Sequence, residues 1–184
     1  MSLILASASP RRAELLTSAG YLFEVAPADV DETPSPGEGP APYALRVARD
    51  KAQAVAAARA GQTVLAADTV VAIDGLILGK PAGAADAARM LRLLSGRLHD
   101  VHTAVVVAAR DGSERAEVVT TRVRFLALTE AEVAWYVASG EPEGKAGAYA
   151  IQGRGARFID WIDGSWSNVV GLPIATVYRL LGGA

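Results

Sequence analysis

The sequence contains no cysteine among its 184 residues. This absence excludes disulfide bonds, thiolate nucleophiles and zinc sites built on thiolates, and it is typical of a cytoplasmic protein. Histidine is scarce as well: only His99 and His102 occur, so a multi-histidine metal site is excluded. Any chemistry carried out by this chain must therefore use carboxylates, lysine, arginine and hydroxyl groups.

A strong excess of one charge and long apolar runs are also missing. The formal net charge is -2, whereas nonspecific nucleic-acid binding needs a broad basic surface. We therefore expect no nucleic-acid partner, and any anion site must come from a local cluster. The apolar start "LILA" is too short for a signal-peptide core or a membrane span, and no later segment reaches that length without a charge. We expect a cytoplasmic protein that does not bind a membrane.

Several stretches resemble common catalytic motifs but do not match them. Gly75 to Lys80 and Gly140 to Lys145 resemble a phosphate-binding loop, but each is one residue short and lacks Ser or Thr after the lysine. The "GRG" stretch at 153–155 is not a dinucleotide fingerprint. No serine in a nucleophile-elbow motif is available for either histidine to activate, which argues against a Ser-His-Asp hydrolase. We expect both histidines to be strand residues with satisfied hydrogen bonds.

What is present predicts an α/β protein that forms a single domain over residues 1–184. The sequence is 51 % hydrophobic, and a chain of this length buries roughly 70 % of its unfolded surface. Tight-turn dipeptides at Asp74-Gly75 and Asp111-Gly112 predict two hairpins. Because hairpins interrupt the alternation of strands and helices, we expect a mixed sheet with flanking helices. The expected strands lie in 2–6, 63–81 (two), 101–128 (two) and 156–164; the expected helices lie in 10–20, 43–61, 84–96, 130–140 and 172–183; a loop is expected over 31–42.

The segment "SASPRR", residues 7–12, raises the first functional question. Ser9-Pro10 predicts the start of a helix, where the helix dipole is positive and arginine costs a few tenths of a kcal/mol. Free backbone N–H groups at such a start bind anions, and guanidinium groups bind phosphate bidentately. With the hydroxyl groups of Ser7 and Ser9, Arg11 and Arg12 therefore predict a phosphate site. The alternative is a pair of solvated surface arginines.

Three further residues have candidate roles. Asp68 lies between the apolar runs "VLAA" and "VVAI", where a carboxylate is costly unless it is paired, hydrogen-bonded or metal-bound. It is the acid that we select as general base or metal ligand, the alternative being a strand-end aspartate that holds a turn. Lys80 stands between Gly79 and Pro81, which fix the backbone around it. Lys51 lies on the alanine-rich helix, and a solvated helix face would explain it equally well.

A set of strings in order resembles the Maf family of nucleoside triphosphate pyrophosphatases. The resemblance runs from Leu3 to about Leu181 and rests on "SASPRR", "VDET", "ADTVV", "GKP", "MLRLLSG", "HTAV", "GEPEGKAGAYAIQGRGA" and "GSWSNVVGLP". It implies a fold similar to inosine-triphosphate pyrophosphatases, with an elongated mixed sheet, flanking helices and two lobes around a cleft. It also implies hydrolysis between the α- and β-phosphates, which releases a nucleoside monophosphate and pyrophosphate.

The resemblance assigns a role to each candidate. Asp68 matches the proton acceptor, and Glu32 with Asp68 matches the acidic positions near a divalent cation, Mg or Mn. The match to the triphosphate-binding positions consists of Ser7, Arg12, Lys51 and Lys80; the match to the specificity positions of the dTTP/UTP subgroup consists of Arg11, Thr69 and Gln152. The Gln152 amide offers one donor and one acceptor, which complement the imide edge of uracil or thymine. Alternatively, Gln152 braces a glycine-rich loop.

Other functions stay open at this stage. The same reaction could act on 7-methyl-GTP or on a mixture of modified nucleotides. The family name refers to inhibition of septum formation, so a nucleotide-binding regulator of cell division is a separate possibility. A homodimer is expected by analogy alone.

Overall fold

A computed structural model of the chain describes residues 3–183. Ser2, which belongs to the first predicted strand, lies outside the described residues. The elements are β1 (Leu3–Leu5), α1 (Pro10–Ser18), β2 (Phe23–Val25), α2 (Pro40–Ala58), β3 (Thr63–Ile73), β4 (Leu76–Leu78), α3 (Ala84–Leu94), β5 (Leu98–Ala108), β6 (Glu114–Phe125), α4 (Glu130–Ala138), the 3₁₀ turns η1 (Ala146–Ala148) and η2 (Arg154–Phe158), β7 (Ile159–Asp163), α5 (Trp166–Val170) and α6 (Ile174–Leu180).

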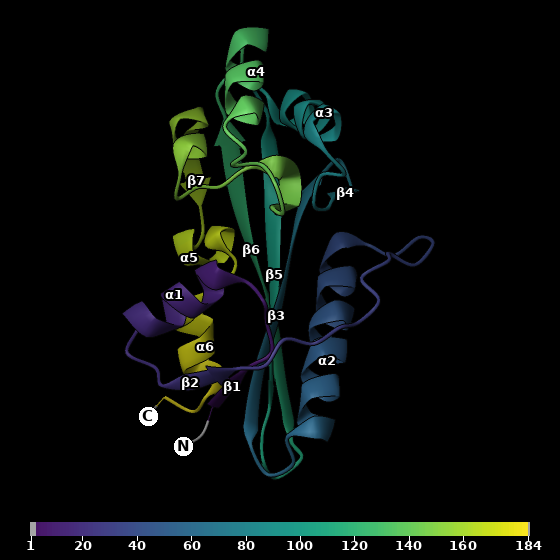
Figure 1. Ribbon diagram of the computed structural model, residues 1–184, viewed down its shortest axis with the longest axis vertical. Helices are drawn as coiled ribbons and strands as arrows, with labels where there is room; N and C mark the ends of the chain where they lie inside the picture. The colour runs from purple at the N-terminus through teal and green to yellow at the C-terminus, as the bar shows by residue number, and fades with distance from the viewer. Residues whose placement is uncertain (1–2, 184) are drawn as a thin grey trace.

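The strands of residues 3–183 form one mixed sheet in the order β2-β1-β3-β5-β6-β7, with β4 paired to β3. β1 runs parallel to β2 and β3, whereas the other pairs are antiparallel. The long strands β3, β5 and β6 extend along the whole molecule, as Figure 1 shows. The predicted mixed α/β architecture is therefore confirmed, and both predicted hairpins are present.

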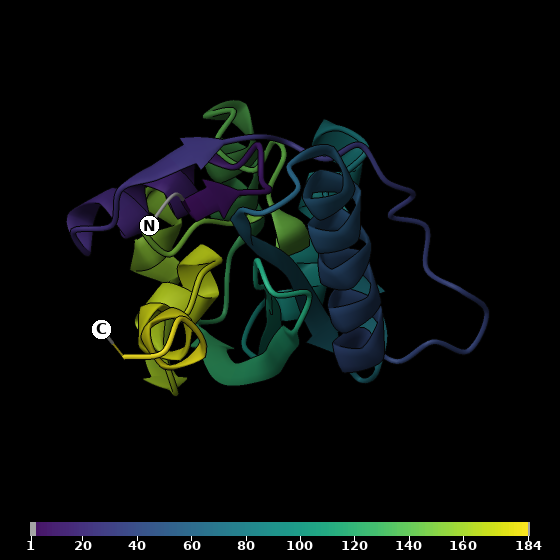
Figure 2. The same cartoon turned by 90° about the horizontal axis from the view of Figure 1, so that it is seen from below.

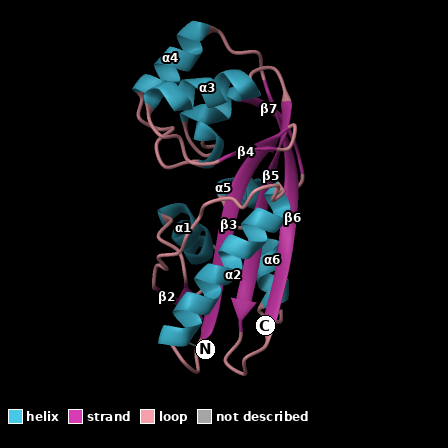
Figure 3. Cartoon of the chain, turned by 90° about the vertical axis from the view of Figure 1, so that its right-hand side faces the viewer, coloured by secondary structure: helices cyan, strands magenta, loops and turns pink. Residues whose placement is uncertain are grey.

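Helices cover the sheet differently at its two ends. Beside the lower half, α2 packs on one face, while α1, α5 and α6 lie on the other (Figures 1 and 2). At the upper end, α3 and α4 form a separate group beside β4 and β7 (Figure 3). The buried side chains follow this division: one cluster lies under α2, one under α1 and α6, and one under α3 and α4. The molecule thus has two lobes that share the central strands.

Three predicted element starts were wrong by three residues. The strand expected from residue 101 begins at Leu98, and the other two differences have identifiable reasons. The helix expected from residue 43 begins at Pro40, inside the predicted loop, because proline needs no N–H partner in a first helical turn. The strand expected from residue 156 begins at Ile159, because residues 154–158 form a 3₁₀ turn. The short elements β2 and α5 were not predicted. Over residues 3–183, no helix has the length and apolar character needed to span a membrane.

Candidate functional site

The candidate site is a cleft of about 560 Å³ between the two lobes. It opens along one edge of β3. β1 pairs with this strand only at Thr63–Leu65, and β4 pairs with it only at Val71–Ile73. The intervening stretch of β3 carries Asp68 and Thr69, both of which line the cleft. Because successive strand residues point to opposite faces, the cleft receives Asp68 from one face of the sheet and Thr69 from the other.

A carboxylate pair and two lysines occupy the α2 side of the cleft. The Lys51 ammonium lies 2.7 Å from an oxygen of Asp68 and 2.6 Å from an oxygen of Glu32. The second oxygen of Glu32 lies 3.1 Å from the Lys80 ammonium. Burial alone would raise the pKa of Glu32, but the two lysines outweigh this effect and lower it. Both carboxylates therefore share one cation, and Glu32 is ionised at neutral pH.

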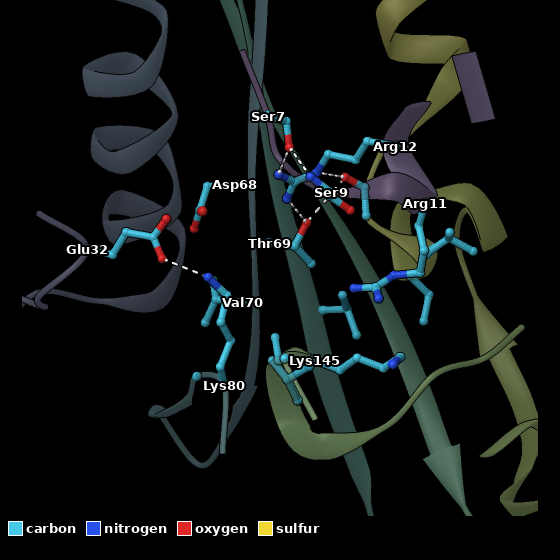
Figure 4. Close-up of a pocket in the computed structure, with 18 of the residues that line it drawn as sticks. Ser7, Ser9, Arg11, Arg12, Glu32, Asp68, Thr69, Val70, Lys80 and Lys145 are labelled. Carbon is cyan, nitrogen blue, oxygen red and sulfur yellow. Dashed lines mark hydrogen bonds and ion pairs between the residues drawn. The ribbon is translucent and has the colours of Figure 1, made fainter. Parts of the chain in front are cut away.

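Arg12 connects the opposite side of the cleft. Its guanidinium donates hydrogen bonds of 3.0 Å to the hydroxyl of Ser7, 3.0 Å to the hydroxyl of Thr69 and 2.8 Å to the carbonyl of Gly171. The side chain is almost completely buried, and burial lowers its pKa from the ordinary arginine value. Together these bonds join the loop after β1, the middle of β3 and the residue after α5; those to Ser7 and Thr69 can be followed in Figure 4. Arg12 thus organises the wall of the cleft.

Arg11 and Lys145 form a second cationic group. Figure 4 shows both side chains extending into the same part of the cleft, without an interaction to the other residues drawn. Burial lowers the pKa of Lys145, and the nearby Arg11 charge lowers it further. Burial lowers the pKa of Arg11 as well. Two half-buried cations that repel each other make an attractive site for an anion that enters between them.

The upper lobe places Lys145 and Gln152 on the remaining wall. Gly147 donates its N–H to the carbonyl of Gly79 at 3.1 Å, which joins the Lys145 segment to the Lys80 segment. Gly147 also has a φ of 67°, and a Cβ there would lie 2.8 Å from the side chain of Val71. Glycine is therefore required for η1 to pack this closely on β3. Gln152 lines the cleft from the loop that follows.

The structure brings all the predicted site residues into this one cleft: Ser7, Arg11, Arg12, Glu32, Lys51, Asp68, Thr69, Lys80 and Gln152. The sequence reasoning missed Lys145 and the carbonyl of Gly171. The lysine had one visible signal, since it ends the Gly140 to Lys145 stretch that resembles a phosphate loop. The two histidines lie in β5, as predicted, outside the cleft, but the prediction of satisfied hydrogen bonds was wrong for His99, whose buried Nδ1 has no partner among the described residues. His99 bonds Tyr149 at 2.9 Å, and burial lowers the pKa of His99 to about 4.

The acidic groups fit a divalent cation only in part. Within residues 3–183, no group of three acidic or histidine side chains could hold a metal by itself. Glu32 and Asp68 approach a common point, which Lys51 occupies. Mg²⁺ is usually held by one or two carboxylates, with waters and substrate phosphates as the other ligands. The donor set therefore fits a cation that arrives with a phosphorylated substrate.

Comparison with known proteins identifies the family. Residues 2–184 match the family described as Maf-like protein, and this chain belongs to that family. It is 56 % identical over 182 residues to the dTTP/UTP pyrophosphatase of Anaeromyxobacter dehalogenans strain 2CP-1, covering 97 % of this chain and 92 % of the relative. It is 53 % identical over 179 residues to the dTTP/UTP pyrophosphatase of Myxococcus xanthus, covering 97 % of this chain and 90 % of the relative.

Solved structures give a more distant likeness. The chain is similar to the Ham1 protein of Staphylococcus aureus, with a TM-score of 0.48 and 16 % identity over 68 % of this chain and 72 % of that chain. It is also similar to a nucleoside-triphosphatase, dITP/XTP pyrophosphatase, of Mycobacterium abscessus. That comparison gives a TM-score of 0.43 and 21 % identity over 68 % of this chain and 74 % of that chain.

Proposed function

We propose that this chain hydrolyses dTTP and UTP to the nucleoside monophosphate and pyrophosphate. The observation that carries the proposal is the cleft itself. It contains a carboxylate pair around one ammonium, and the same cleft is lined by a separate cationic group and by a glutamine. The names of the relatives, at more than half identity over nearly the whole chain, support the same substrates. The substrate class implies that the enzyme works in the cytoplasm, where nucleoside triphosphates are made and used.

The proposed reaction breaks the anhydride between the α- and β-phosphates. A water oxygen forms a bond to one of the two phosphorus atoms, and the bond from that phosphorus to the bridging oxygen breaks. The bridging oxygen leaves with the other phosphate, and the proton of the water passes to the Asp68 carboxylate. Lys51 holds that carboxylate at 2.7 Å. Fixing the base in this way orients it before the substrate arrives.

The cations of the cleft bind the triphosphate in this proposal. Arg12 keeps Ser7 and Thr69 in place, while Lys51 and Lys80 lie beside the carboxylates. A divalent cation, Mg or Mn, would be held by Glu32 and Asp68 together with phosphate oxygens. When bound there, it would neutralise charge that develops on the leaving phosphates.

Gln152 reads the base in this proposal. Uracil and thymine present an imide N–H beside a carbonyl, and the glutamine amide supplies the matching acceptor and donor. Arg11 and Thr69 line the same cleft and, in this proposal, contribute to the choice of substrate. A base without the matching groups would leave a polar atom without a partner, which costs affinity.

The first test is pyrophosphate release from a panel of nucleoside triphosphates with Mg²⁺ or Mn²⁺. The panel contains dTTP, UTP, CTP, 7-methyl-GTP and the common purine nucleotides. Release concentrated on dTTP and UTP is the expected result. Release from 7-methyl-GTP alone would keep the reaction and reject the substrate assignment. Binding without release from any nucleotide, in a folded sample supplied with metal, would favour a nucleotide-binding regulator instead.

Gln152→Leu is expected to lower kcat/KM for dTTP and UTP by about 10-fold, the effect of losing one or two hydrogen bonds. The leucine fills a similar volume but cannot bond the imide. Initial rates at varied substrate concentration measure the change. Inhibition by inorganic pyrophosphate serves as the control, because pyrophosphate has no base and should bind both proteins equally. An unchanged kcat/KM for UTP would remove Gln152 from base recognition.

Lys145→Met is expected to raise KM for the triphosphate by about 10-fold and to change kcat less. The reason is that a half-buried cation facing Arg11 gains stability when an anion binds beside it. Increasing salt should weaken substrate binding by the wild type more than by the variant. Arg110→Met removes one positive charge from the exposed turn after β5 and is the matched control. If both substitutions changed KM equally, general surface charge would explain the result.

A further inference from the structure

Outside the cleft, a buried hydrogen-bonded unit holds the loop that carries Gln152. We name this unit the Tyr136–Glu141 clamp. Tyr136 comes from α4 and is fully buried, and its hydroxyl donates a 2.8 Å hydrogen bond to one oxygen of Glu141. Neither side chain lines the cleft. The structure described so far gives this pair no part in binding or chemistry.

The clamp accepts hydrogen bonds from the loop backbone on both sides of Gln152. Two residues before it, the N–H of Ala150 donates to the Tyr136 hydroxyl at 3.1 Å. Two residues after it, the N–H of Arg154 donates to Glu141 at 2.8 Å, and the N–H of Gly155 donates to the other Glu141 oxygen at 3.0 Å. Burial raises the pKa of Glu141, but these hydrogen bonds outweigh it and lower the pKa overall. The carboxylate is thus ionised at neutral pH and accepts three hydrogen bonds.

Gly153 and Gly155 are required at their positions because the clamp side chains lie so close to the backbone of the loop. A Cβ at Gly153 would collide with the Glu141 carboxylate. A Cβ at Gly155 would lie 2.7 Å from both the Ala150 carbonyl and the Tyr136 hydroxyl. The same contacts produce the 3₁₀ turn where the sequence predicted a strand. The "GRG" stretch is therefore not a nucleotide-binding fingerprint. Its glycines pack against the side chains of Glu141 and Tyr136.

Resting on the proposed function, we infer that Tyr136 and Glu141 are positioning residues that set substrate selectivity by fixing the loop on which Gln152 is presented. A glutamine amide that turns over can match cytosine as well as uracil, because it has one donor and one acceptor. Selectivity for uracil therefore requires the amide to be held in one orientation, and its backbone must be fixed first. A loop ordered during folding also costs less binding energy when the nucleotide arrives.

Three variants weaken the clamp in different ways. Tyr136→Phe keeps the buried ring and removes only the hydroxyl. Glu141→Gln replaces one accepting oxygen by an NH₂ group, which faces N–H donors. Gly153→Ala leaves both clamp residues intact and displaces the loop. Glu143→Gln is the matched control, since it makes the same chemical change two residues away on an exposed side chain.

The expected result is a rise in KM for UTP of about 3- to 10-fold in each clamp variant, the effect of about one lost hydrogen bond. The ratio of kcat/KM for UTP to that for CTP should fall by a similar factor, with kcat within about threefold of wild type. Glu143→Gln should match the wild type. A fall in kcat alone, or folded variants with unchanged KM and unchanged UTP-to-CTP ratio, would overturn the inference.

Hydrogen exchange separates this inference from the proposed function. In peptides covering 149–158, the backbone amides should be protected in the wild type and exchange at least 10-fold faster in the clamp variants. If the wild type hydrolyses neither UTP nor dTTP, the proposed function fails, and exchange alone decides whether the clamp holds the loop. Equal exchange in wild type and all three variants would overturn the clamp, whatever the substrate.

Discussion

Asp68→Asn is expected to lower kcat for UTP and dTTP by about 10²- to 10⁴-fold, the range for loss of a general base. The asparagine has the same shape but cannot take the proton of the attacking water. The fold should survive, because Lys51 keeps its 2.6 Å contact to Glu32 and the asparagine oxygen still accepts a hydrogen bond. Steady-state rates at saturating metal, together with thermal unfolding, measure both effects.

The same variant distinguishes the two roles that the sequence leaves open for Asp68. Loss of a base lowers kcat at every metal concentration and removes the acidic limb of the pH–rate profile. Loss of a metal ligand instead raises the Mg²⁺ concentration needed for half-maximal rate, and excess metal restores turnover. Asp50→Asn, on α2 beside Lys51 but paired with Arg46, is the matched control and should keep wild-type rates. Wild-type turnover by Asp68→Asn would reject both roles.

Much of the fold could be predicted because local signals and tertiary packing agree in its long elements. Asp74-Gly75 and Asp111-Gly112 form the expected turns, and Thr129 with Glu132 forms a capping box at the start of α4. Prediction was wrong where long-range contacts decide. Residues 156–158 carry a strand-like pattern, but the Glu141 carboxylate holds the chain before them in a 3₁₀ turn. The contact joins residues 13 and 14 positions apart, which no local pattern reports.

The site was easier to predict than its geometry. Asp68 and Lys80 were visible from the residues around them, while Glu32 and Gln152 entered only through the family resemblance. Lys145 was missed because its one signal, the stretch from Gly140 that resembles a phosphate loop, is one residue short and lacks Ser or Thr after the lysine. Its importance comes from facing Arg11, more than 130 positions earlier in the chain. The fold decides which charged side chains face one another, and the composition of a segment cannot reveal this.

The adjacent arginines illustrate this difference most clearly. In the sequence they share one motif and one expected purpose, which is to attract phosphate at a helix start. In the structure, Arg12 turns inward and donates to Ser7, Thr69 and Gly171, whereas Arg11 extends into the cleft beside Lys145. Arg12 therefore connects parts of the fold, and Arg11 is positioned for an incoming anion. The same substitution should therefore affect folding stability at Arg12 and substrate binding at Arg11.

Arg12→Met is expected to lower the free energy of unfolding by about 2–4 kcal/mol, because it removes the buried guanidinium that donates to the Gly171 carbonyl and to two hydroxyl groups. Arg11→Met should change that free energy by less than about 0.5 kcal/mol, since a substitution without such partners is usually nearly neutral. Urea unfolding measures the free energy of unfolding of both variants.

Arg11→Met should instead lower kcat/KM for UTP by at least about 10-fold, the loss expected for a charged phosphate contact. Because the two variants make the same chemical change on neighbouring residues, a pair of equal stability losses would contradict this division. If Arg12→Met unfolded at the same urea concentration as the wild type but bound UTP more weakly, Arg12 would be a direct phosphate ligand.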